Sequence, residues 1–127
     1  MPRIFQALNI EKEEKELKRD YLDRHMPYVI CADEVRRAEK FVVKVRIGNE
    51  YPHPDEYDHS IILIQLWNRE TLLAEARYTP GVYGNLPGHF EIDFHIVAPD
   101  VSMNLCAMSV CSKHGLWQSE DKAVKVV

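Results

Sequence analysis

Apolar and polar positions alternate with a period of two along much of the chain after Pro27. In segment 41–47 every odd position is apolar, Val42, Lys44 and Arg46 lie between, and the run ends at Gly48. Segment 90–96 repeats the pattern, with aromatic and aliphatic residues at its even positions. Such alternation is typical of a strand with one buried face. Both segments are therefore predicted strands that face a core.

Four further segments extend the strand pattern. Residues 60–67 form a nearly continuous apolar run, as in a strand buried on both faces, and 72–78 could be its hairpin partner. Residues 103–110 predict another strand, and 123–127 a short last one. Segment 79–88 is rich in glycine, proline and asparagine and must be a loop. Many short strands separated by turns indicate an all-β protein with a β-sandwich architecture.

The N-terminal part has a different character. Residues 9–22 are crowded with glutamate and lysine, which are good helix formers. Pro27 biases the residue before it toward an extended conformation, so this helix should give way near Met26. We interpret the helix as a solvated element lying on the domain rather than as a partner-binding helix. By length the whole chain, 1–127, is expected to be a single domain, with residues 1–24 as its helical extension.

Composition narrows the function classes. The net charge of −4 argues against a general binder of nucleic acid or anionic membranes. No segment reaches the length of a membrane span, and no apolar signal core begins the sequence, so we expect a cytoplasmic protein. The three cysteines form no C-x-x-C pair and make a disulfide framework improbable. They are also too few for a four-thiolate metal site, which leaves the six histidines as the main supply of ligands.

The most specific candidate chemistry lies at Cys111 and His114. A thiol and an imidazole stand three residues apart, and Gly115 follows at once. Glycine readily takes a positive φ, which lets the backbone turn away from a bound metal. The spacing is therefore typical of two metal ligands on one tight turn.

Two more histidines, His53 and His59, lie in a segment between predicted strands. If that segment were extended, they would be about 20 Å apart, whereas ligand nitrogens on one metal lie roughly 3–4 Å from each other. Both can bind one metal only if the segment folds back, for which its prolines and aspartates supply turn chemistry. Two exposed loop histidines are an equally good interpretation of the spacing alone.

The remaining histidines and cysteines carry weaker indications. His25 precedes Met26-Pro27, and by itself it is better interpreted as an exposed or capping residue than as a ligand. His89 follows the glycine-rich loop and His95 lies on the polar phase of a strand, so neither is assigned a role. Cys31 and Cys106 are most simply small buried hydrophobic residues.

Three motifs together resemble the superoxide reductases of the neelaredoxin and desulfoferrodoxin group. They are His25-x-Pro27, His53-Pro54 with His59 six residues after the first histidine, and Cys111-x-x-His114-Gly115-Leu116-Trp117. The resemblance spans residues 23–117 in order and spacing. It implies an immunoglobulin-like β-sandwich that holds one mononuclear non-haem iron. The N-terminal four-cysteine domain of desulfoferrodoxins has no counterpart here, so the chain resembles the one-iron type.

The resemblance also implies roles. His25, His53, His59 and His114 would be four equatorial imidazole ligands, and Cys111 would be the axial thiolate. The implied reaction is the one-electron reduction of superoxide, with two protons, to hydrogen peroxide. A thiolate pushes electron density onto iron, which favours that reduction. The electron would come from rubredoxin or a similar small carrier, and a homodimer or homotetramer is implied.

Two candidate catalytic residues, Asp23 and Arg24, depart from the Glu-Lys pair that many members carry before this histidine. In those members the glutamate caps the oxidised iron. Asp23 is one methylene shorter, about 1.3–1.5 Å of reach, which puts that role in question. The family lysine would orient superoxide. Arg24 keeps the charge but presents a planar fork in place of a compact ammonium.

Two alternatives from other classes stay open. The same ligands could hold a structural zinc in a sandwich that only binds a partner, although zinc prefers a closed set of four. The chain could also be a small iron electron carrier without turnover.

Overall fold

The computed structural model of the chain describes residues 19–127. Within that range the chain forms one short helix and nine strands. Their bounds are α1 (Arg19–His25), β1 (Pro27–Ile30), β2 (Glu34–Val35), β3 (Lys40–Ile47), β4 (Ile61–Asn68), β5 (Thr71–Arg77), β6 (Glu91–Val97), β7 (Met103–Cys111), β8 (Gly115–Gln118) and β9 (Lys122–Val126).

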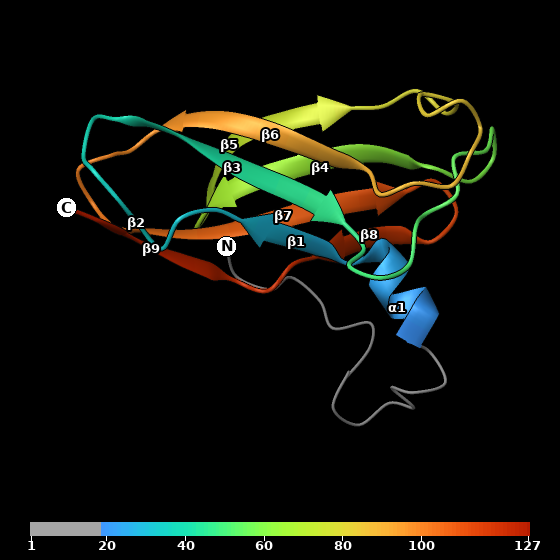
Figure 1. Cartoon of the computed structure of the whole chain (residues 1–127), viewed down its shortest axis with the longest axis horizontal. Coiled ribbons are helices and arrows are strands. Elements are labelled where there is room, and N and C mark those ends of the chain that lie inside the picture. Colours follow the sequence, from blue (N-terminus) through green and yellow to red (C-terminus); the bar gives the residue numbers. More distant parts are fainter. Residues whose placement is uncertain (1–18) are drawn as a thin grey trace.

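The strands form two sheets that face each other (Figure 1). One sheet has the order β1-β3-β6, and the other has the order β2-β9-β7-β4-β5 with β8 paired to β7. Every pairing is antiparallel except the short β2–β9 pair. The predicted all-β sandwich with a short N-terminal helix is therefore confirmed.

The alternating segments place their apolar phase between the sheets. Val43, Val45 and Ile47 of β3 have no exposed surface, and Phe94 of β6 is 7% exposed. Side chains of β4 and β7, Leu66 among them, fill the same core from the opposite sheet. Because side chains in a strand alternate between its faces, these positions fix which face each strand buries. The period-two prediction for segments 41–47 and 90–96 is thus confirmed.

The other predicted strands are confirmed as β4, β5, β7 and β9, and β5 is the antiparallel partner of β4 as expected. Strands β1, β2 and β8, which have two to four residues each, were not predicted. In β4, Ile61, Ile64 and Leu66 are buried and the other residues are half-buried, so the expected burial of both faces is only partly correct. Of the helix expected over 9–22, residues 9–18 lie outside the described residues, and α1 ends at His25 as the proline predicts.

The ends of β3, β5 and β7, the loops that follow β3 and β5, and α1 lie at one end of the sandwich (Figure 1). The backbone ties α1 to this end: Gly48 N donates to Met26 O at 2.9 Å, and Ser109 Oγ of β7 donates to His25 O at 3.2 Å. This end therefore brings together segments that are far apart in the sequence. In the described residues, no helix is long and apolar enough to cross a membrane.

Candidate metal centre

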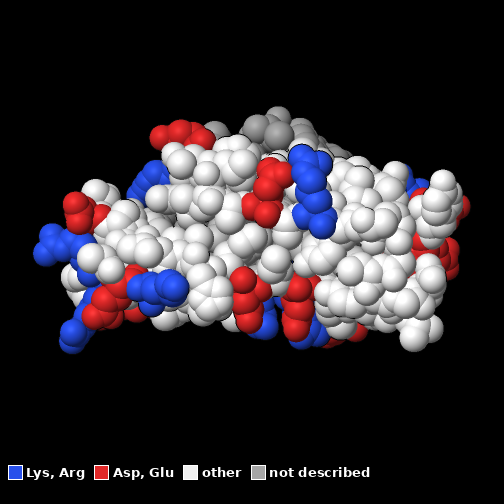
Figure 2. All heavy atoms as spheres, turned by 90° about the horizontal axis from the view of Figure 1, so that it is seen from above, with Lys and Arg blue, Asp and Glu red and all other residues white. Residues whose placement is uncertain are grey.

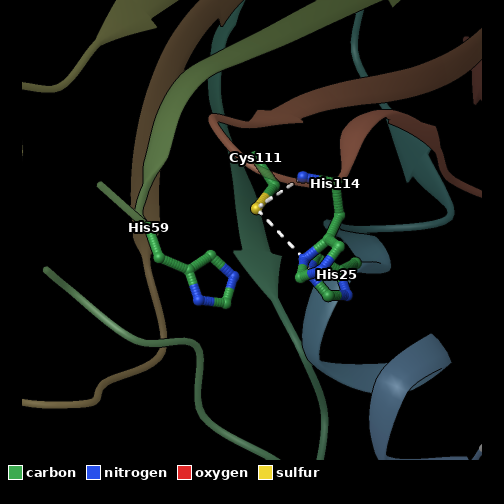
Figure 3. A group of neighbouring side chains, drawn as sticks. All are labelled: His25, His59, Cys111 and His114. Carbon is green, nitrogen blue, oxygen red and sulfur yellow. Dashed lines mark hydrogen bonds between the residues drawn. The ribbon is translucent and has the colours of Figure 1, made fainter.

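Five predicted ligands come from four places at this end of the sandwich. His25 is the last residue of α1, His53 and His59 lie in the β3–β4 loop, and Cys111 ends β7 one turn before His114. Potential ligand atoms of His25, His59, Cys111 and His114 all lie within 4.8 Å of one another. Figure 3 shows these four side chains directed toward one another. The structure thus gathers residues separated by up to 89 positions.

His53 lies outside that group of four but completes a ring of imidazoles. Its ring centroid is 5.0 Å from that of His25 and 4.9 Å from that of His59. His114 closes the ring, at 4.9 Å from His59 and 4.8 Å from His25. Neighbouring rings stand at 74–80° to each other, and the His25–His59 diagonal is 6.3 Å. Four imidazoles therefore form an approximate square.

The second nitrogens of two of these rings are held by backbone carbonyls. Nδ1 of His25 lies 2.7 Å from Tyr21 O, and Nδ1 of His53 lies 2.7 Å from Pro54 O. Each carbonyl can only accept, so each Nδ1 carries the proton and Nε2 keeps its lone pair. A carbonyl partner of this kind orients metal-binding histidines in proteins.

Two buried nitrogens lack a partner, and a third lies unusually close to another ring nitrogen. Nε2 of His53 and Nε2 of His59 are buried with no hydrogen-bond partner among residues 19–127. His25 Nε2 lies 3.1 Å from His114 Nδ1, the separation of adjacent ligands on one metal with bonds of about 2.1 Å. Buried polar atoms are nearly always satisfied in native proteins. A metal cation among these atoms satisfies them, so the donor set fits a bound metal.

Burial also keeps the imidazoles neutral. It lowers the pKa of His25 and of His53 to about 4, and it lowers the pKa of His59 as well. The neighbouring histidines and Arg24 add to the effect on His25. A neutral imidazole is the form that binds metals, so these rings are ready for a metal at neutral pH.

The turn after β7 presents the thiol. His114 N donates to Cys111 Sγ at 3.4 Å, and His114 Nδ1 lies 3.7 Å from the same sulfur. Gly115 has a φ of 79°, the positive value that the sequence predicts for this turn. Burial raises the pKa of the Cys111 thiol, while backbone amides and Lys113 oppose the rise. A bound metal cation would take the place of the thiol proton, since thiolate is the ligand form.

An aromatic cluster that the sequence analysis missed packs beside His25. Trp117 of β8 stacks on the His25 ring, with centroids 4.9 Å apart and planes at 14°. Tyr21 touches Trp117 and His114 edge-on. Trp117 Nε1 donates to His114 O at 3.2 Å. The tryptophan of the Cys-x-x-His-Gly-Leu-Trp motif thus holds the imidazole of His25 and the backbone of His114, and its place in that motif was the available indication.

The β3–β4 loop folds back, as binding of one metal by both its histidines requires. A buried carboxylate that the sequence analysis interpreted only as a turn former, Asp55, stabilises the fold-back. It accepts hydrogen bonds from Ser60 Oγ and from the amides of Gly81, Tyr83 and Asn85, at 2.7–3.2 Å. Burial alone would raise the pKa of Asp55, but these hydrogen bonds outweigh it and hold the pKa below its usual range.

The two candidate catalytic residues lie beside the ring of histidines rather than within the group. Asp23 accepts hydrogen bonds from Tyr28 and from the start of the β3–β4 loop. Arg24 Nη2 lies 3.5 Å from a carboxylate oxygen of Asp20, one helical turn earlier. The residues left without a role, His89, His95, Cys31 and Cys106, also lie outside the group.

A β-sandwich with four imidazoles and one thiol gathered at one end is typical of one class, the mononuclear metal proteins with a mixed nitrogen and sulfur donor set. The family model of desulfoferrodoxin matches residues 11–120. The chain belongs to the desulfoferrodoxin family.

Relatives in other organisms and a solved structure are similar to this chain in sequence and in fold. The chain is 31% identical to a neelaredoxin from Megalodesulfovibrio gigas, over 80% of this chain and 87% of the relative. It is 28% identical to a superoxide reductase from Pyrococcus furiosus, over 77% of this chain and 86% of the relative. A variant of the superoxide reductase (neelaredoxin) from Ignicoccus hospitalis matches the whole fold with a TM-score of 0.76, at 27% identity and full coverage of both chains.

Proposed function

We propose that this protein is a superoxide reductase, which reduces superoxide by one electron to hydrogen peroxide at a mononuclear non-haem iron. His25, His53, His59 and His114 would hold the iron as four imidazole ligands, and Cys111 would hold it as a thiolate. The activity of the named relatives and the family membership support the proposal. The observation that carries it is the square of four histidine rings beside a buried thiol.

The ring geometry favours iron over a structural zinc. Zinc prefers four ligands in a closed tetrahedron. Four imidazoles in an approximate square, with the thiol of Cys111 beside His114, offer five donors instead. Imidazole suits iron, and a soft thiolate adds electron density to it. The donor set therefore supports a redox metal more strongly than a closed structural site.

Different residues of the chain would contribute to different parts of the reaction. When bound, iron supplies a one-electron change of oxidation state. The carbonyls of Tyr21 and Pro54 fix the rings of His25 and His53, and Trp117 excludes water from one face of His25. As a thiolate, Cys111 would hold its charge in a buried place, where a bound cation would interact with it strongly.

Superoxide is an anion, and local positive charge would attract it. On the face seen in Figure 2, acidic and basic side chains are interspersed, so a broad positive field does not explain attraction there. Arg24 and Lys113 act locally: after burial, Arg24 contributes to the lowered pKa of His25 and His53, and Lys113 to that of His59. We propose that these two cations steer superoxide to the centre.

Replacing Arg24 by alanine should slow the second-order reaction of the reduced protein with superoxide about two- to tenfold at low salt, because one steering charge is lost. The difference should shrink near physiological salt, where the Debye length falls to about 8 Å. Stopped-flow measurement over a range of ionic strengths checks this expectation.

The matched control is Arg37→Ala, which removes one positive charge from an exposed side chain before β3, at the opposite end of the sandwich. It should leave the rate close to that of the unaltered protein. Equal rates for the Arg24 and Arg37 variants at every salt concentration would show that Arg24 does not steer.

The proposal extends to partners and location. A small one-electron carrier of the rubredoxin kind would supply the electron, since each superoxide consumed needs one from outside. The resemblance supports a homo-oligomer, a dimer or tetramer, and one iron-binding domain over residues 1–127. All three cysteines are free thiols, which supports a reducing compartment such as the cytoplasm.

Reaction of the reduced protein with superoxide, scored for peroxide, tests the proposed activity.

A further inference from the structure

The Asp23 carboxylate, two residues before His25, has no acceptor site left for a metal. Oδ1 accepts from Tyr28 Oη at 2.7 Å and from Asn49 N at 3.1 Å. Oδ2 accepts from Glu50 N and Tyr51 N, both at 2.8 Å, and shares the Asn49 amide at 3.1 Å. An ionised carboxylate offers about four lone-pair sites. Four donors therefore fill it.

These hydrogen bonds join two segments that carry histidines. Asp23 lies in the last turn of α1, which ends at His25. The three amides open the β3–β4 loop and end two residues before His53. The His25 and His53 rings are neighbours in the square, with centroids 5.0 Å apart. A displacement of the loop relative to the helix would change that spacing directly.

The backbone at Gly48 shapes the loop so that it can meet the carboxylate. Gly48 has a φ of 79°, and a Cβ atom there would lie 2.4 Å from the carbonyl oxygen of Tyr51. Only glycine accommodates this turn, because other residues rarely adopt that φ and the clash is with backbone. The turn directs three successive amides to one side, where Asp23 accepts all of them.

We propose that Asp23 is a positioning residue, which sets the spacing of His25 and His53 by clamping the loop start to the helix end, and that it does not bind the metal. The inference rests on the proposed ligand set. To reach a metal, the carboxylate would have to release four donors at once, and the loop before His53 would lose its anchor. The aspartate in this chain therefore performs a different task from a capping carboxylate.

The experiment measures Co²⁺ binding to the metal-free protein by its thiolate-to-cobalt absorption, together with amide hydrogen exchange at residues 49–51. Asp23→Asn keeps the shape but replaces one acceptor oxygen by a donor. It should weaken Co²⁺ affinity by about tenfold, the lower end of the 10–100-fold that groups hydrogen-bonded to metal ligands contribute, because Asp23 holds the segments that carry the ligands rather than the ligands themselves. Exchange at the three amides should speed up by a similar factor before any metal is added. The cobalt band, and the blue band of the oxidised iron protein, should stay at their wavelengths.

Two further variants make the test independent of overall stability. Tyr28→Phe removes one donor and leaves the carboxylate, so it should change affinity in the same direction by a smaller factor; it carries the test if Asp23→Asn does not fold. Val124→Ala shortens a core side chain of β9, paired with the start of β7 and far from Cys111. It should lower stability and leave Co²⁺ affinity unchanged.

Unchanged Co²⁺ affinity and unchanged amide exchange in Asp23→Asn would overturn the inference. A shifted absorption band in the oxidised iron form of that variant would also overturn it, because the carboxylate would then be a ligand. If the unaltered protein itself fails to bind Co²⁺, the proposed ligand set fails, and the inference fails with it. Failure of the unaltered protein to bind Co²⁺ is distinct from a result in which it binds Co²⁺ and Asp23→Asn has no effect, which would overturn the inference about Asp23 alone.

Discussion

Cys111→Ser should remove the blue colour of the oxidised iron protein entirely. The colour is expected from charge transfer between thiolate and iron, and a serine hydroxyl does not supply it. The reaction with superoxide should also slow by about 100-fold or more, since even groups that only support metal ligands contribute 10–100-fold. Absorption spectra of the oxidised variant and stopped-flow rates of the reduced variant measure the two effects.

Cys106→Ser is a matched control for the same atom change. Cys106 is fully buried on the same strand, but its Sγ faces Gln118 Nε2 at 3.3 Å and the Ser119 hydroxyl at 3.6 Å. Folded Cys106→Ser protein should keep the blue band and the rate. A blue Cys111→Ser protein, or a colourless folded Cys106→Ser protein, would contradict the assignment of the thiolate.

Asp55→Ala should destabilise the protein by roughly 3 kcal/mol or more, because it leaves three backbone amides and a hydroxyl without their acceptor. The loss should concentrate at the loop 79–88 and at the β3–β4 loop, which Asp55 joins. His53 and His59 lie on either side of Asp55, so metal affinity should fall as well. Denaturant unfolding gives the free energy, and amide exchange at residues 81, 83 and 85 locates the change.

Asp58→Ala is the control for charge, since Asp58 belongs to the same loop and is exposed. It should change the unfolding free energy by less than about 0.5 kcal/mol, as is usual for surface substitutions. Equal stability of the two alanine variants would show that the buried carboxylate does not hold the loops together.

Two of the correctly predicted strands, β3 and β6, show why alternation is informative. In β3 and β6 the apolar side chains recur at every second residue over seven or eight positions, and that period is itself the cause of one-sided burial. Strands β1, β2 and β8 are too short for a period to appear. Strand β8 also begins at Gly115, within the motif that the spacing of Cys111 and His114 identifies as a metal turn.

The site divides in a similar way. That Cys111 and His114 can bind one metal is predictable from their residue types and short spacing, because the two residues share one turn. The fold-back between His53 and His59 could not be decided from spacing. It depends on Asp55, whose partner amides lie 26–30 residues further along the chain. The hydrogen bonds of Asp23 to residues 49–51 are equally non-local. The shorter side chain therefore only put the capping role in question, and the partners that occupy this carboxylate could not be predicted.

The most direct test of the proposed activity is a stopped-flow reaction of the reduced iron protein with a known pulse of superoxide. The proposal predicts one hydrogen peroxide formed for each superoxide consumed, with one iron oxidised per event and no oxygen released. A dismutase would instead release one oxygen for each peroxide. Superoxide that decays no faster than in buffer, or oxygen release in step with peroxide, would contradict the proposal that this protein is a superoxide reductase.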